Sequence, residues 1–463
     1  MVRSLLTLGA AALLGATAVL ADDIPTCSLD KKCPESAPCC SQYNQCGVGA
    51  YCLGGCDPRM SFSLDSCVPA PVCKDMTYKM DSLDRYKDIS EYLGDSSKTD
   101  WVGQGEPLLY DGNVLLTMPP KSVGTVLATT TYMWYGNVKA RLKTSRGRGV
   151  VTAFILFSDV KDEIDYEFVG VDLQTAQTNY YFQGIPDYVN GGNATIEGNS
   201  YDDFHDYEIN WTPDEIQWII DGKVGRTKKR SETWNATSNQ WAYPQTPSRV
   251  QISIWPGGAD TNAKGTVDWA GGAIDWNSDE IKDFGYYFAT FAEVSVKCFN
   301  ANSPPGTNKA NSYYYNNIKG TNDTVVDSDK PTILKSLLGT GTNMNKGDGS
   351  SSTTGAHPSH SSGASVPGGG TAQVPGGTNP GAGTGNGNGA NPNGDGSGSS
   401  NSGGSGSGTS GASPCQASGF SQSCDEGGSN GGTNPNSGSR VADRTLGASA
   451  FAVVIGFAGL LLL

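Results

Sequence analysis

The fold of the main domain is decided by a stretch that alternates acidic and apolar side chains, Lys161-Asp162-Glu163-Ile164-Asp165-Tyr166-Glu167-Phe168. Side chains of a β-strand point alternately to the two faces of a sheet. Glu163, Asp165 and Glu167 therefore share one face. Their apolar neighbours share the other face and can pack into a core, which fixes the register of the strand and places the three carboxylates together.

Short β-rich runs separated by turn residues recur on both sides of this stretch, across residues 74–300. Long helical periodicity is absent from this region. Many short alternating strands favour an all-β fold with one large core, a jelly-roll β-sandwich. The expected strands are 113–118, 135–143, 150–157, 164–169, 207–211, 216–220, 250–255 and 293–296.

Cysteines define a second, smaller unit at residues 22–73. Nine of the twelve cysteines lie between Cys27 and Cys73. A segment of this size cannot stabilise itself by burial alone, so we expect a disulfide-rich module. The even cysteine count favours an oxidising compartment, and zinc is a poorer alternative because no histidine lies nearby.

Composition excludes several classes of function. The formal net charge is −14 and no basic stripe interrupts it, so we expect no nucleic-acid partner. His205 is the single histidine of the foldable part, which argues against a multi-histidine metal site or a second histidine in a catalytic relay. No phosphate loop or dinucleotide fingerprint occurs. We therefore expect neither a metal nor a cofactor.

Both ends of the chain predict that the protein is exported from the cell. Residues 1–21 have the positive start, apolar run and small residues of a secretory signal peptide, which we prefer to a membrane anchor. Residues 437–463 end in an uncharged apolar tail behind a polar spacer, as in a removed glycosylphosphatidylinositol (GPI) signal, with Asn436 as the expected attachment residue. The alternative for this end is a single membrane span.

A low-complexity segment rich in Gly, Ser, Thr and Asn fills residues 301–436, and its composition is most biased from 351 onward. Such a segment cannot bury enough apolar surface to offset its ordering entropy, so we expect a disordered stalk. Secretion would also make N-x-[ST] sequons available for glycosylation. These are Asn193, Asn235, Asn322 and, inside an expected strand, Asn210.

The three clustered carboxylates are the strongest chemical signal. Retaining glycosidases need two carboxyl groups about 5–5.5 Å apart. The Cα atoms of Glu163 and Glu167 should be about 13 Å apart, and side chains that lean together can close much of that gap. Repulsion within the trio would raise at least one pKa, which would keep one glutamate as an acid beside an ionised nucleophile. A solvated acidic face and a calcium site are the alternatives.

Residues 162–167 resemble the active-site strand of glycoside hydrolase family 16. The segments 144–147, 158–161, 253–258 and 268–272 resemble the fungal Crh-type branch, cell-wall transglycosylases that join chitin to β-glucan. The resemblance covers residues 75–300 and implies a jelly roll with substrate in a groove across its concave face.

Site roles follow from that resemblance. It implies that Glu163 is the nucleophile, Asp165 an assisting residue and Glu167 the general acid/base. A chitin donor would form a glycosyl-enzyme, which a β-glucan acceptor rather than water would resolve. Substrate-binding candidates are Glu167, Gln251, Trp255, Thr266, Asn179, Tyr181 and His205.

The 22–73 module resembles hevein-like chitin-binding modules, most specifically at Cys39-Cys40-Ser41. The resemblance implies that Ser41, Tyr43 and Tyr51 grip N-acetylglucosamine. Gln45 replaces an aromatic residue of the family, and a disulfide knot with little sugar affinity is the alternative. The implied disulfides are Cys27–Cys40, Cys33–Cys46, Cys39–Cys52 and Cys56–Cys67, which leaves Cys73 for Cys298.

Together these features predict a secreted, GPI-anchored, monomeric transglycosylase at the outer face of the cell membrane or in the cell wall. Its partners would be a chitin donor, a β-glucan acceptor and, through the anchor, the membrane. Two alternatives stay open: a chitin or β-glucan hydrolase of the same fold, and a non-catalytic polysaccharide-binding protein of the wall.

Overall fold

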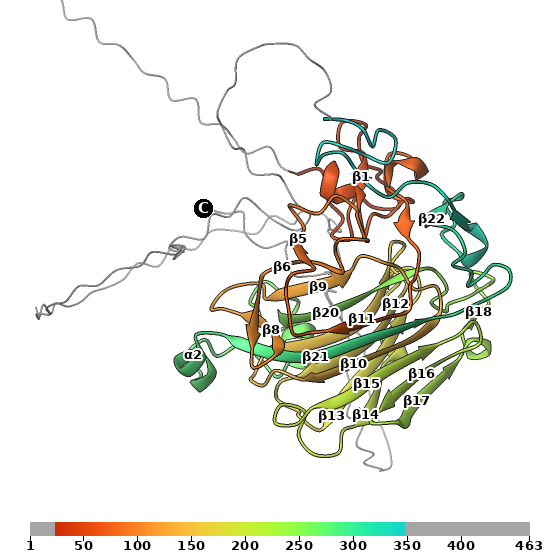
Figure 1. The fold of residues 1–463 in the computed structure, drawn as a ribbon. Helices are drawn as coiled ribbons and strands as arrows, with labels where there is room; N and C mark the ends of the chain where they lie inside the picture. The colour runs from red at the N-terminus through yellow and green to blue at the C-terminus, as the bar shows by residue number, and fades with distance from the viewer. Residues whose placement is uncertain (1–23, 348–463) are drawn as a thin grey trace, which may run out of the picture.

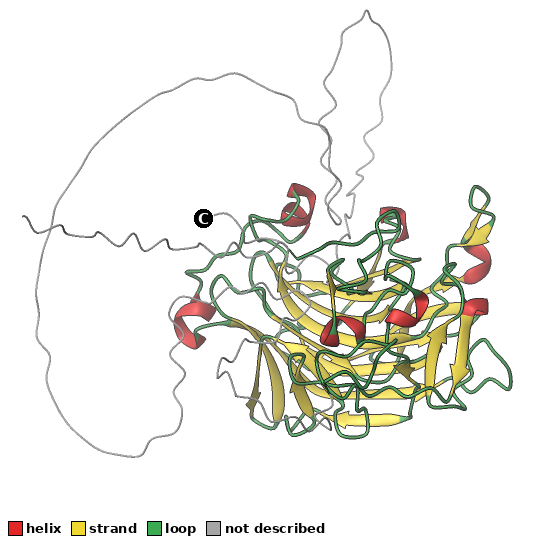
Figure 2. Ribbon diagram, turned by 90° about the horizontal axis from the view of Figure 1, so that it is seen from above, coloured by secondary structure: helices red, strands yellow, loops and turns green. Residues whose placement is uncertain are grey.

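The computed structural model describes residues 24–347. The expected signal peptide, residues 348–436 of the expected stalk, with the expected attachment residue Asn436, and the expected GPI signal 437–463 lie outside the described residues. Within the described range strands predominate, and the helices are short (Figure 2). No helix of this range is long and apolar enough to cross a membrane.

Two eight-stranded sheets pack around one core and form the expected β-sandwich (Figure 1). We call the sheet that carries Glu163, Asp165 and Glu167 the carboxylate sheet. Its strands, in spatial order, are β14 (Gly192–Thr195), β13 (Thr175–Tyr181), β12 (Glu163–Val169), β11 (Val150–Ser158), β20 (Ser248–Pro256), β9 (Thr125–Thr129), β6 (Trp101–Gln104) and β5 (Tyr86–Asp88). Neighbours in it are antiparallel except β5 and β6.

The other sheet, called the outer sheet, is antiparallel throughout. Its strands, in spatial order, are β17 (Lys223–Lys229), β16 (Glu215–Ile220), β15 (His205–Trp211), β10 (Gly136–Lys143), β21 (Tyr287–Cys298), β8 (Asn113–Met118) and β7 (Glu106–Tyr110), with β4 (Met76–Lys79) also on β21. All eight strands expected from the alternation pattern are present in the two sheets, which confirms the all-β prediction.

Short elements connect and flank the sheets. They are β1 (Cys39–Cys40), β2 (Cys46–Gly47), β3 (Ala70–Pro71), β18 (Trp234–Asn235), β19 (Gln240–Trp241), β22 (Ser312–Tyr315), β23 (Val325–Ser328), α1 (Lys264–Trp269), α2 (Asp279–Phe284), η1 (Gly49–Cys52), η2 (Leu64–Ser66), η3 (Tyr188–Asn190), η4 (Arg230–Glu232) and η5 (Asn322–Thr324).

The cysteine-rich module is held by four disulfides, and a fifth joins its end to β21. The pairs are Cys27–Cys40, Cys33–Cys46, Cys39–Cys52, Cys56–Cys67 and Cys73–Cys298, the same pairs that the resemblance implies. The fifth closes a loop with a sequence separation of 225 and ties the module's boundary to the last strand of the outer sheet.

Residues 301–347, expected to be the start of a disordered stalk, are folded instead. β22 pairs with β23 and with β3, and Tyr313 and Val325 are buried in the main core. Further on, Leu334 is 1% exposed within the module's apolar cluster. The backbone N–H of Gly49 also donates to the carbonyl of Gly339 at 2.8 Å. Aromatic and aliphatic side chains in this polar stretch supply the burial that offsets its ordering entropy.

The module packs directly on the carboxylate sheet, beside β5, β6 and β9 (Figure 1). Leu53 of the module shares an apolar cluster with Val102 and Ala128 of the sheet. The backbone N–H of Gly55 donates to Asp159 Oδ1 at 2.9 Å. Module and sandwich are therefore joined by both apolar and polar contacts.

Candidate active site

Strand β12 places the three carboxylates as the alternation predicts. Ile164, Tyr166 and Phe168 are at most 1% exposed in the core between the sheets, so the acidic side chains point to the opposite face. The outer sheet contacts this strand on its core face. The Trp218 indole donates to the carbonyl of Asp165 at 2.9 Å. The Tyr166 hydroxyl donates to the carbonyl of Ile219 at 3.0 Å, so the register of β12 is fixed by packing and by hydrogen bonds.

All three carboxyl groups of β12 are buried, and burial raises each pKa because it disfavours the charged form. The pKa of Glu163 rises to about 8, through burial and the neighbouring Glu167, while contact with Asp165 and the charge of Lys161 act in the opposite direction. Burial, and then their acidic neighbours, also raise the pKa values of Asp165 and Glu167. Each carboxyl group of the trio therefore holds its proton more strongly than an exposed carboxyl group would.

Asp162, the first acid of the motif, has a structural role that the sequence pattern does not distinguish. Its Oδ1 accepts from the backbone N–H of Gln183 at 2.9 Å. Its Oδ2 accepts from the backbone N–H of Gln245 and from the N–H and hydroxyl of Thr246. This carboxylate ties three loops together at the entry of β12.

The neighbouring strand β13 adds polar side chains to the carboxylate face. Tyr181 lies opposite Glu163, and Asn179 lies opposite Asp165. The Asn179 amide donates to the Tyr181 hydroxyl at 2.7 Å. Both residues therefore lie beside the trio, as predicted. Gln177 continues the same alternation opposite Glu167 and was not among the predicted residues.

On the other side of β12, the apolar strand β11 separates the trio from β20. Ile155 of β11 lies between Asp165 and Gln251, and Ala153 lies between Glu167 and Ser253. Residues paired in this way share a face. Gln251 and Ser253 therefore belong to the carboxylate face. Val151, Ala153, Ile155 and Phe157 form an apolar floor between the two polar rows.

Trp255 and Trp269 close the end of this face that lies beyond Glu167. Their rings stack with centroids 6.0 Å apart and an interplanar angle of 24°. The Trp269 indole donates to Gln177 Oε1 at 2.7 Å, which links α1 to β13. Thr266 of the same helix is 1% exposed.

Several buried polar atoms of this face have no hydrogen-bond partner within residues 24–347. They are Glu163 Oε1, Asp165 Oδ1 and Oδ2, Glu167 Oε1, Gln251 Oε1, Ser253 Oγ, Trp255 Nε1 and Thr266 Oγ1. A buried polar group without a partner costs about 1–3 kcal/mol. Donors and acceptors share one face, over an apolar floor and beside stacked indoles. That arrangement suits a ligand with many hydroxyl groups and apolar ring faces.

His205 does not belong to the site, contrary to the prediction. It lies on β15 of the outer sheet, and its Nδ1 is 2.7 Å from Asp221 Oδ2. Residue type alone suggested it. Its strand pairs with β10 and β16, which place the ring on the other layer of the sandwich.

Two of the three residues predicted to grip sugar on the cysteine-rich module are buried. Ser41 is 3% exposed, and Tyr51 is 2% exposed in the cluster that joins the module to the sheet. Neither side chain presents a surface to a polysaccharide in solution. Tyr43 is half-buried and lines a pocket shared with Gln251 of the carboxylate sheet.

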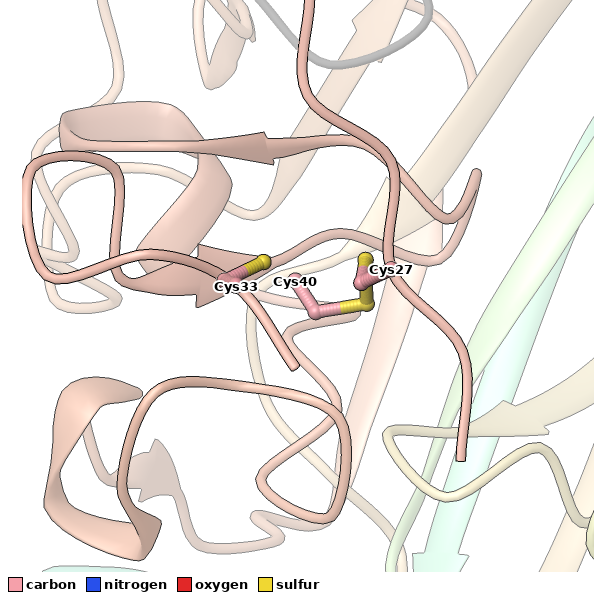
Figure 3. Close-up of side chains that lie close together, drawn as sticks. All are labelled: Cys27, Cys33 and Cys40. Atoms are coloured by element: carbon pink, nitrogen blue, oxygen red, sulfur yellow. A yellow bond between two sulfur atoms is a disulfide. The ribbon is translucent and has the colours of Figure 1, made fainter. Parts of the chain in front are cut away.

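The sulfur atoms of Cys27, Cys33 and Cys40 lie within 4.8 Å of one another (Figure 3). Each belongs to a disulfide, Cys27 with Cys40 and Cys33 with Cys46. A metal needs the thiolate form of cysteine. This cluster is consequently a product of close disulfide packing.

The predicted sequons differ in accessibility. Asn193 and Asn235 are exposed, on β14 and β18. Asn210 and Asn322 are half-buried, and the Asn210 amide lies 3.5 Å from Gln217 Oε1. Glycosylation at all four positions stays a prediction.

Comparison with known proteins gives a consistent result. The family model for glycosyl hydrolases family 16 matches residues 95–271. Crh-like protein 3 of Botryotinia fuckeliana is 62% identical over 340 residues, 73% of this chain and 76% of the relative. Crh-like protein 2 of Aspergillus fumigatus is 54% identical, over 75% of this chain and 79% of the relative.

Similarity extends to a more distant fungus and to a solved structure. Congo red hypersensitive protein 2 of Saccharomyces cerevisiae is 45% identical, over 69% of both chains. The solved structure of apo Crh5 transglycosylase is 28% identical with a TM-score of 0.47, and the match covers 59% of this chain and all of that one.

Proposed function

Because the chain belongs to the Crh-like proteins of glycosyl hydrolase family 16, we propose that it is an extracellular retaining transglycosylase that cuts chitin and transfers the cut chain to β-glucan. The observation that carries the proposal is the carboxylate trio of β12, buried together on one face of the strand. The substrates it would take are cell-wall polysaccharides.

The resemblance of β12 to the active-site strand of family 16 supports the catalytic roles. Glu163 is the nucleophile, which must be charged to attack. Glu167 is the acid, and burial raises its pKa, which favours the protonated form that this role needs. Asp165 lies between them on the same face, and its contact with Glu163 favours the charged form of the nucleophile.

The proposed reaction has two steps, the formation and the resolution of a glycosyl-enzyme. Glu163 attacks the anomeric carbon, the glycosidic C–O bond breaks, and the proton of Glu167 passes to the leaving oxygen. An acceptor hydroxyl then loses its proton to Glu167 while its oxygen bonds to the anomeric carbon and releases Glu163. The donor and the product have the same anomeric configuration, and the glycosidic bond that is cut is replaced by a new glycosidic bond.

The polar row of β20 and the indoles would hold the polymer. Gln251, Ser253 and Trp255 carry unpartnered buried atoms on the carboxylate face, and Thr266 carries another beside them. The sugar chain would lie over the apolar floor of β11, between the cysteine-rich module and the Trp255–Trp269 pair.

Incubation of the purified protein with chitin oligomers and a fluorescent β-glucan acceptor tests this function. Labelled product of high mass is the expected result, and Glu163→Gln should abolish it. Glu106→Gln is the matched control, since Glu106 is exposed on β7 of the outer sheet. Short free sugars without labelled product would identify a hydrolase instead.

The ends of the chain suggest where the reaction takes place. Cleavage after a signal at residues 1–21 and lipid attachment at Asn436 would place a monomer at the outer face of the cell membrane, on a stalk starting near residue 348. Release of the protein from intact cells by a phosphatidylinositol-specific phospholipase tests the anchor. Retention in the wall after that treatment would instead indicate transfer of the protein to the wall.

A further inference from the structure

Among the contacts of the cysteine-rich module with the carboxylate sheet is one buried amide side chain, that of Gln42. Gln42 Oε1 is 3.1 Å from Arg249 Nη2 and 3.3 Å from Gln251 Nε2. All three residues are buried, with exposures of 7%, 5% and 1% respectively. The contact joins residues more than 200 positions apart in the sequence.

Hydrogen-bond chemistry fixes the orientation of both amides. A guanidinium group can only donate, so the Gln42 atom that faces Arg249 must be the carbonyl oxygen. That oxygen has two lone pairs and accepts its second bond from Gln251. The Gln251 atom in this bond must therefore be the NH₂ group, which leaves the carbonyl oxygen of Gln251 to face elsewhere.

That remaining oxygen belongs to the proposed substrate face. Gln251 Oε1 is buried without a partner within the described residues. Gln251 lies across β11 from Asp165, since both pair with Ile155. Two strand spacings put it about 10 Å to the side of the trio. Gln42, Tyr43 and Gln251 line the same pocket between the module and the sheet.

We propose that Gln42 is a positioning residue of the transglycosylation, which holds Gln251 as an obligate hydrogen-bond acceptor for the polysaccharide. The group recognised is a donor, a hydroxyl or an amide N–H of a sugar unit next to the bond that is cut or formed. The module then serves as one wall of the catalytic site instead of a separate chitin-binding domain. This inference rests on the proposed function.

Gln42→Leu tests this series of hydrogen bonds, because leucine keeps roughly the side-chain volume and removes the acceptor. Without that acceptor the Gln251 amide can rotate, so Gln42→Leu should lower kcat/KM about tenfold, the loss of roughly one hydrogen bond. The loss should fall on the KM of one substrate, the chain that lies over Gln251. A structural defect would instead affect donor and acceptor kinetics alike.

A conservative variant and a double variant separate positioning from folding. Gln42→Glu keeps an oxygen that accepts from both Arg249 and Gln251, so activity should stay within about threefold of the original protein. Gln42→Leu combined with Gln251→Leu should be no worse than Gln251→Leu alone, because both act through the same bond. Glu35→Leu, at an exposed site of the same module, is the control and should change nothing.

Different results overturn the two proposals. If the original protein transfers no sugar at all, the proposed function is wrong. If it is active and Gln42→Leu matches it, or Gln42→Glu is as poor as Gln42→Leu, Gln42 has no positioning role. Additive losses in the double variant would also overturn the inference, since they would show that Gln42 does not act through Gln251.

Discussion

The two faces of β12 differ in how they treat buried polar groups. On the core face, the buried Tyr166 hydroxyl donates to the carbonyl of Ile219. On the carboxylate face, Glu163 and Glu167 each keep a buried oxygen without a partner in the described part of the chain. One strand thus has a satisfied side that stabilises the fold and an unsatisfied side that a substrate would complete. Natural folds keep such unsatisfied groups mainly where function requires them.

The largest effect should come from the carboxylate face. Glu163→Gln removes the nucleophile, so we expect transfer activity to fall about 10⁴-fold or more. The change is nearly isosteric and removes a charge from a buried cluster, so the protein should still fold. Transfer rates and circular dichroism measured together check both points. An active Glu163→Gln variant would refute the nucleophile assignment.

A change on the core face should lower stability strongly and activity only weakly. Phe168 is 1% exposed, and its ring centroid lies 4.6 Å from that of Tyr207 in the outer sheet. Phe168→Ala should lower the free energy of unfolding by about 3–5 kcal/mol through the cavity it leaves. Activity per folded molecule should fall far less than in Glu163→Gln. Denaturant unfolding and active-site titration would reveal any other pattern.

The sequence predicted this two-faced strand because strand alternation is a local property. The same alternation found the eight expected strands and placed Gln251 and Trp255 on one face of their strand. Asn179 and Tyr181 were named without a strand argument, and Gln177, which continues their alternation, was missed. Local pattern was therefore sufficient for the carboxylate face of β12.

Long-range packing explains what the sequence could not predict. Ser41 and Tyr51 were expected at the surface, but the docking of the module buries them against residues far along the chain. Residues 312–328 form strands because Tyr313 and Val325 find a core built by earlier segments. His205 has a suitable side chain for catalysis but lies on the other layer.

The two faces should also differ in how pH affects stability. The pKa of Glu163 is raised from an ordinary 4.5 to about 8. Between these values the folded state binds more protons than the unfolded state, so stability falls as pH rises from 4.5 to 8. Glu163→Gln should remove this fall in stability, because glutamine does not titrate. Its advantage in unfolding free energy should be absent near pH 4 and reach roughly 5 kcal/mol above pH 8.

Thermal unfolding of both proteins across this pH range measures the gap. Glu106→Gln, with its side chain in solvent, supplies the comparison and should show a constant offset. A gap between Glu163→Gln and the original protein that does not widen with pH would mean that burial does not raise the pKa of Glu163.

The smallest of these effects tests whether the carboxylate face binds sugar rings through Trp255. Trp255 stacks on Trp269 and keeps an unpartnered indole N–H within the described residues. Trp255→Ala should lower kcat/KM about tenfold, because stacking and one hydrogen bond are lost. Trp255→Phe should restore about half of that loss in free energy, since a ring returns without the N–H.

Trp234 offers the matched control for this change. It is 47% exposed on β18 and packs edge-on against Trp241, away from the carboxylate sheet. Trp234→Ala should leave kcat/KM within about twofold, as for surface substitutions in general. Equal losses in Trp234→Ala and Trp255→Ala would show that the tryptophans act through general stability. A loss confined to Trp255 would mark the carboxylate face of the sheet, and not its core face, as the sugar-binding side.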